Sequence, residues 1–93
     1  MHVSFAMARY FFNLLVGGRS IPDPEGQEFG SLEEALSVAE LSMCEIAADR
    51  LRTGDLVDLE AILITDPDGH SLARLSTKDA VLSRFRSFLR LNG

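Results

Sequence analysis

The sequence predicts a single α+β domain, in which a small antiparallel or mixed sheet packs against two helices. Two long segments place apolar residues at helical spacing, and other segments are rich in the branched and aromatic residues that suit strands. Glycine and proline clusters separate these segments. Strands and helices in this order favour a sheet with helices packed against it. The expected strands are 9–16, 59–65 and 71–75, with a short one possible within 19–29, and the expected helices are 32–53 and 78–91.

The first expected strand, 9–16, has apolar residues at odd and even positions alike. Both of its faces are therefore apolar, and we expect it to be covered on more than one side. Gly17 and Gly18 follow it and allow a tight turn with positive φ angles. The two prolines of segment 22–26 remove backbone donors, so only short pairing is expected within 19–29.

The long helix is expected to begin after Ser31, because Ser31 and Glu34 form a capping box. In this motif the hydroxyl accepts from the Glu34 backbone N–H while the Glu34 carboxylate reaches back, so that two orphan donors are satisfied. Gly54 provides the C-terminal stop. The apolar stripe that would face the sheet consists of Leu32, Ala35, Leu36, Ala39, Met43, Ile46 and Ala47.

A hairpin and a second helix follow. Segment 59–65 has a continuous apolar centre, which is typical of a central strand. The Asp66-Pro67-Asp68-Gly69 turn then leads into the antiparallel strand 71–75. The helix 78–91 is amphipathic, with one face formed by Val81, Leu82, Phe85, Phe88 and Leu89.

Composition excludes several classes of protein. The 93 residues include 9 basic and 14 acidic side chains, a net charge of −5, so binding of nucleic acid through the overall field is not expected. No apolar run approaches the length of a membrane span. The single cysteine, Cys44, cannot form an internal disulfide, which fits the cytoplasm. Residues 1–6 resemble an upstream leader that is loosely ordered, and Met7 then opens a domain spanning 7–93.

Candidate metal and cofactor sites are weak. Asp66 and Asp68 stand beside His70, but Asp and Gly are common turn formers, and a calcium loop needs ligands spread over about 12 residues. One dependable histidine and one distant cysteine do not make a zinc site. Neither a nucleotide-binding glycine loop nor a Gly-x-Ser-x-Gly elbow is present. We therefore expect no metal and no cofactor.

The acidic loop is the remaining place for catalysis. Asp23, Glu25 and Glu28 lie close together in sequence, but acid–base work would require them to face each other in a desolvated cleft. Cys44 lies within a helix between acidic neighbours, where a lowered thiol pKa is not expected. We expect no catalytic residues, and a small enzyme that uses the acidic loop stays as the last alternative.

Two surfaces are candidates for binding. The first is a second apolar stripe on the long helix, formed by Leu41, Cys44, Ala48 and Leu51. Either the C-terminal helix covers this stripe or another subunit does. The second is the basic surface of the C-terminal helix, formed by Arg84, Arg86 and Arg90. That helix could pack on the domain's own core, lie on an anionic membrane, or meet the acidic long helix of a neighbouring subunit.

Several segments resemble a family of short bacterial proteins that open with Arg-Tyr-Phe-Phe and form a domain of unknown function. The similar segments are Arg9-Tyr10-Phe11-Phe12, Asp23-Pro24-Glu25-Gly26, Leu32-Glu33-Glu34-Ala35, and Ile64-Thr65-Asp66 with Gly69 and Leu72. The resemblance spans about residues 7–80 and supports Met7 as the start. It implies no activity and no site residues.

A looser resemblance is to HicB-like antitoxins. It lies in Pro22-Asp23-Pro24-Glu25-Gly26 and in Leu32-Glu33-Glu34-Ala35. It implies a small sheet against a helix that oligomerises and masks a small basic ribonuclease toxin, and an acidic chain suits a basic partner. The loop departs from the antitoxin pattern, and no DNA-binding segment follows it.

The leading hypothesis is a non-enzymatic, cytoplasmic protein-interaction domain that self-associates, with a dimer as the expected state. An antitoxin-like inhibitor of a small basic toxin is the second hypothesis. Neither involves a cofactor or direct contact with nucleic acid.

Overall fold

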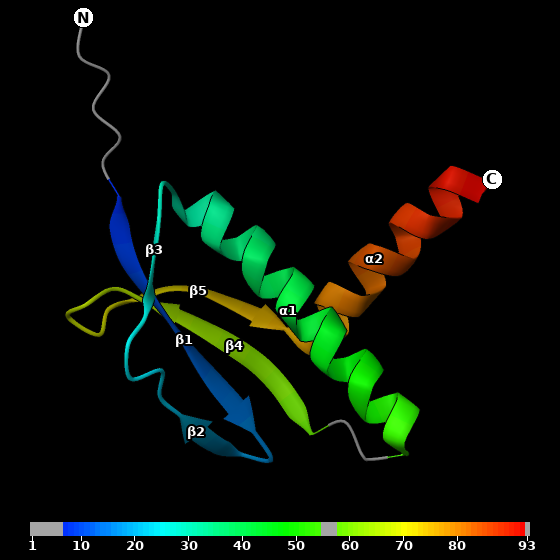
Figure 1. Cartoon of the computed structure of the whole chain (residues 1–93), viewed down its shortest axis with the longest axis horizontal. Coiled ribbons are helices and arrows are strands. Elements are labelled where there is room, and N and C mark those ends of the chain that lie inside the picture. Colours follow the sequence, from blue (N-terminus) through cyan, green and yellow to red (C-terminus); the bar gives the residue numbers. More distant parts are fainter. Residues whose placement is uncertain (1–6, 55–57, 93) are drawn as a thin grey trace, which may run out of the picture.

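A computed structural model describes residues 7–54 and 58–92, with the backbone alone for Phe85 and residues 87–92. It confirms the α+β class, with a five-stranded sheet and two helices (Figure 1). The expected leader, residues 1–6, lies outside the described residues. The elements in chain order are β1 (Ala8–Val16), β2 (Arg19–Ile21), β3 (Gln27–Phe29), α1 (Leu32–Thr53), β4 (Leu59–Thr65), β5 (Ser71–Ser76) and α2 (Thr77–Asn92).

The sheet is antiparallel at every pairing, with the strand order β2-β1-β4-β5. On the edge of β1 away from β4, β2 pairs with residues 14–16 and β3 pairs with residues 8–10. β2 agrees with the short strand possible within 19–29, and β3 is an additional strand in the same stretch. They are interrupted where the prolines of segment 22–26 cannot donate to the ladder.

Helix α1 has the bounds expected from its caps. The Ser31 hydroxyl accepts from the Glu34 backbone N–H at 3.1 Å, and Gly54 takes a left-handed conformation with φ of 81°. The Glu34 carboxylate reaches back to the N–H of Gly30, at 3.1 Å. The capping box therefore also orients the turn that leads in from β3.

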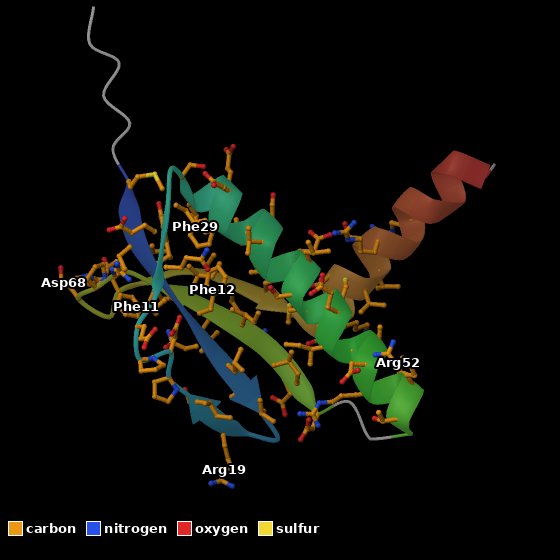
Figure 2. The ribbon with its side chains drawn as sticks, viewed as in Figure 1. Phe11, Phe12, Arg19, Phe29, Arg52 and Asp68 are labelled. Atoms are coloured by element: carbon orange, nitrogen blue, oxygen red, sulfur yellow. The ribbon has the colours of Figure 1, made fainter. Side chains whose placement is uncertain are left out.

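The core lies between α1 and one face of the sheet. Alternating residues of β1 and β4 point into it, and α2 contributes its first turn. Phe29 is buried beneath the start of α1 and stacks on Phe12, with ring centroids 5.7 Å apart (Figure 2). The buried cluster consists of Ala39, Met43, Leu59, Ile62, Ile64 and Ala80.

The opposite face of β1 is covered differently. Phe11, Asn13 and Leu15 alternate with the core residues and are half-buried. Gly26 lies against the Phe11 ring, so the loop between β2 and β3 shields this side of the strand. The second cover expected over β1 is therefore provided, among the described residues, by a loop at one end of the strand.

Helix α2 begins one residue earlier than predicted and ends one residue later. Ser76 accepts from the backbone N–H of Asp79 at 3.1 Å and acts as the N-cap, a signal that the sequence prediction missed. The C-terminal half of α2 projects beyond the sheet (Figure 1). Among the described helices, none combines the length and the apolar character that crossing a bilayer requires.

Candidate functional site

The candidate site is an apolar groove of about 340 Å³ between the two helices. We call this surface the α1–α2 groove. Its lining residues are Cys44, Ala47, Ala48, Leu51, Val81 and Arg84. Three of the four residues of the predicted second stripe on α1 therefore line one hollow.

The groove exists because α2 crosses α1 with its first turns only. Ala80 is buried, and the Cys44 thiol lies 3.9 Å from its carbonyl oxygen. One turn further, Arg84 Nε lies 3.6 Å from Glu40 Oε1. Beyond this crossing α2 diverges from α1 (Figure 1).

The second stripe on α1 is covered by α2 along only part of its length. Cys44, near the crossing, is half-buried by α2. Leu51 is 69% exposed and Leu41 is 46% exposed, so α2 does not cover the ends of the stripe. The cysteine has the partial burial expected of a small apolar side chain in a helix interface.

The three arginines predicted to form the basic surface of α2 differ in their surroundings. Both Arg84 and Arg86 are exposed, but Arg84 pairs with Glu40 of α1, whereas Arg86 belongs to no ion pair among the described residues. The predicted third member, Arg90, lies outside the described side chains. On the apolar face of α2, Val81 and Leu82 are 42% and 41% exposed. Among the described side chains of α2, packing on the domain's own core is therefore limited to Ala80 and its immediate neighbours.

The acidic loop is organised around Asp23. Its carboxylate accepts from the backbone N–H groups of Phe12, Glu25 and Gly26 at 3.1, 3.2 and 3.1 Å. Its own N–H donates to Asn13 Oδ1 at 3.0 Å. The Asp23 side chain therefore provides a hydrogen-bond acceptor for a backbone N–H of β1 that has no partner strand at this point.

These contacts also set the charge state of Asp23. Burial alone would raise its pKa, but the hydrogen bonds from Gly26, Phe12 and Glu25, with the nearby Arg9 charge, lower the pKa below its usual value. Glu28 pairs with Arg9 at 3.5 Å. Asp23 and Glu28, two of the three acids of this loop, thus make contacts that hold the loop in place.

The turn between β4 and β5 brings together Asp66, Asp68 and His70, whose potential metal-ligating atoms lie within 4.8 Å of one another. The Asp66 carboxylate accepts from the backbone N–H groups of Asp68 and His70 at 2.9 and 2.8 Å. Desolvation would raise the pKa of Asp66, but the hydrogen bonds from His70 and Asp68 outweigh it and lower the pKa. Asp68 and His70 are exposed, and Figure 2 shows Asp68 at the end of the turn.

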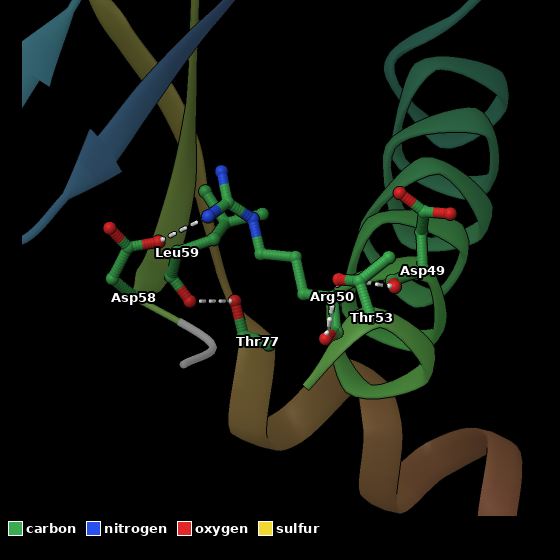
Figure 3. A network of polar contacts seen from close by, with 6 residues as sticks. All are labelled: Asp49, Arg50, Thr53, Asp58, Leu59 and Thr77. Carbon is green, nitrogen blue, oxygen red and sulfur yellow. Dashed lines mark hydrogen bonds and ion pairs between the residues drawn. The ribbon is translucent and has the colours of Figure 1, made fainter. Parts of the chain in front are cut away.

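Polar contacts join the end of the sheet to both helices (Figure 3). The Thr77 hydroxyl donates to the carbonyl of Leu59 at 2.6 Å, which fixes the start of α2 on β4. Arg50 of α1 lies 3.3 Å from Asp58 Oδ1. Both helices that form the groove are thereby held to the same end of β4.

Comparison with protein families gives a match over most of the chain. Residues 9–78 match the family described as domain of unknown function DUF6894. The chain belongs to the DUF6894 family. This agrees with the expected membership in a family of unknown function. No curated protein and no solved structure matches the chain.

The DUF6894 match contains α1 and the sheet apart from Ala8, the first residue of β1, and it ends at the second residue of α2. The α1 side of the groove therefore lies within the matched region. Val81 and Arg84, on the α2 side, lie beyond it.

Proposed function

We propose that this DUF6894 chain is a non-enzymatic protein-interaction domain that self-associates through the α1–α2 groove. The observation that supports the proposal is the exposure of large apolar side chains on both walls of one hollow, above all Leu51 at 69%. Contiguous exposed apolar surface on a small domain is typical of a protein-binding site. Burying such a surface against a second copy removes it from water at a gain of roughly 25 cal/mol per Å².

The placement of the acidic side chains supports a non-enzymatic role. Asp23 and Asp66 both use their carboxylates to accept backbone hydrogen bonds, which holds each in its ionised form and occupies its oxygens. Such groups stabilise loops and are poorly suited to exchange protons near neutral pH.

The proposal is tested by measuring mass in solution. Sedimentation or light scattering is expected to give a mass above the 10.2 kDa of one chain. Leu41→Glu combined with Leu51→Glu places charge on the open ends of the stripe and is expected to reduce that mass. Leu72→Glu is the matched control, because Leu72 is 40% exposed but lies on β5. A wild-type chain that stays monomeric at about 1 mM would overturn the proposal.

The second candidate is an antitoxin-like inhibitor of a small basic toxin. The net charge of −5 favours a basic partner. The loop that resembles those antitoxins makes internal contacts through Asp23, so the same residues also have a structural explanation. Co-expression with a small basic protein encoded beside the gene, followed by a growth assay and co-purification, separates this candidate from self-association alone.

A further inference from the structure

The α1–α2 groove has one apolar wall on each helix and opens to solvent. Leu51 and Ala48 on α1 face it from one side, and Val81 on α2 faces it from the other. An occupant must therefore present apolar side chains along a narrow element, such as a helix. This inference rests on the self-association proposed above and concerns which part of the second copy enters the groove.

The charges of the two helices are opposite and equal. Helix α1 contains five acidic and two basic residues, a net charge of −3. Helix α2 contains four basic residues and one acidic residue, a net charge of +3. Complementary charge of this kind steers association and selects partners.

Within the described part of one chain this complementarity is used only at the crossing. Among the described side chains, Glu40–Arg84 is the ion pair that joins the two helices. Glu45 on α1 and Arg86 on α2 are both exposed, and neither belongs to an ion pair among the described residues. Glu45 lies one turn from both Leu41 and Ala48, so it borders the apolar stripe.

The direction of α2 makes its basic surface available to another molecule. The helix has 16 residues, and its C-terminal half projects beyond the sheet and away from its own α1 (Figure 1). It can therefore lie along the α1 of a second copy without leaving its own core contact at Ala80.

We infer that α2 of a second copy of this chain occupies the α1–α2 groove, and that the exchange is reciprocal about a two-fold axis. Each copy then offers an acidic α1 with an apolar stripe and receives a basic α2 with an apolar face. A two-fold arrangement forms every contact twice and closes at the dimer. The exposed leucines of both helices and their unpaired charges are covered in the same step.

Charge exchange between variants tests this arrangement on the full chain. Arg86→Glu and Glu45→Lys each place like charges across the proposed interface, and each is expected to raise the dimer dissociation constant about tenfold. An equimolar mixture of the two variants is expected to recover most of the lost affinity, because each variant then meets its complement. The wild-type dimer is also expected to weaken with added salt.

Matched controls reproduce the charge changes away from the groove. Arg19→Glu on β2 and Glu25→Lys in the loop change the net charge by the same amounts (Figure 2). Both are expected to leave the dissociation constant within about twofold of the wild-type value.

The outcomes separate this inference from the proposed function. If the chain dimerises and Leu51→Glu weakens the dimer, but the mixture binds no more tightly than either variant alone, α2 is not the occupant while self-association stands. If the wild-type chain is monomeric throughout, both proposals fall. Binding of the monomer to anionic vesicles, lost in Arg86→Glu, would assign the basic surface of α2 to a membrane instead.

Discussion

The Asp23 carboxylate accepts a hydrogen bond from the backbone N–H of Phe12 at 3.1 Å. Phe12 lies between the part of β1 that pairs with β3 and the part that pairs with β2. The Asp23 side chain thus takes the place of a partner strand on the edge of β1 between β3 and β2. The first two predictions follow from this contact.

Asp23→Ala removes the acceptor for three backbone N–H groups at once. We expect it to lower the free energy of unfolding by about 2–3 kcal/mol, because the donors in this half-buried loop lose a charged partner. Urea unfolding followed by circular dichroism measures the change. Glu25→Ala is the control, with an expected effect within about 0.5 kcal/mol, because the described hydrogen bonds of Glu25 involve its backbone. Equal losses in the two variants would contradict the role of Asp23.

Asp23 also makes stability depend on pH. Its pKa is lowered in the folded state, so its contribution is fully present above the unfolded value of 3.8 and is lost as the pH falls through the folded value. We expect wild type and Asp23→Asn to differ most in unfolding free energy near about pH 6 and to converge toward about pH 2. Urea titrations at several pH values measure this difference. A gap that stays constant over the range would show that the carboxylate charge is not involved.

Gly26 cannot accept a side chain without strain. Its φ is 69°, and a Cβ atom there would lie 2.9 Å from the carbonyl oxygen of Tyr10 and 3.0 Å from the Phe11 ring. We expect Gly26→Ala to cost about 2–3 kcal/mol of unfolding free energy. Gly18→Ala is the matched control, because φ is 78° there but nothing lies within 4 Å, and about 1 kcal/mol is expected. Thermal and urea unfolding of both variants distinguish the steric contact from the φ strain.

Ser76 caps α2 through the N–H of Asp79. Ser76→Ala is expected to lower the free energy of unfolding by about 1 kcal/mol. Ser83→Ala, at an exposed position inside the same helix, is expected to be neutral or slightly stabilising because alanine has the higher helix propensity. Urea unfolding of the two variants checks this contrast, and an Ser83→Ala loss as large as that of Ser76→Ala would argue against the cap.

The elements that the sequence predicted well have local signals. Ser31, Glu34 and Gly54 act within one or two turns of α1, so the bounds of that helix could be read without knowledge of the tertiary structure. The role of Asp23 could not, because it depends on which strands pair with β1 and in what register. The pairing of 27–29 with β1 could not be predicted for the same reason.

The residues of the candidate site could be predicted from the sequence only in part. Helical spacing identified Leu41, Cys44, Ala48 and Leu51 as a second stripe. Spacing could not tell how far α2 would cover them, since the contact at Ala80 depends on the direction in which the chain leaves β5. Spacing also placed Val81 on the apolar face of its helix, but it could not tell that this residue lines the groove.

The two central strands come from distant parts of the chain. Asn13 of β1 stands opposite Leu63 of β4, and the Asn13 amide donates to the Leu63 carbonyl at 3.2 Å across 50 positions of sequence. The entropy cost of closing a loop of that length is incurred before the contact stabilises the chain, and this slows folding. Before β4 arrives, β1 pairs only with the three-residue strands β2 and β3 among the described residues. Most of the ladder therefore depends on joining the two halves of the chain, and the domain should unfold as one cooperative whole.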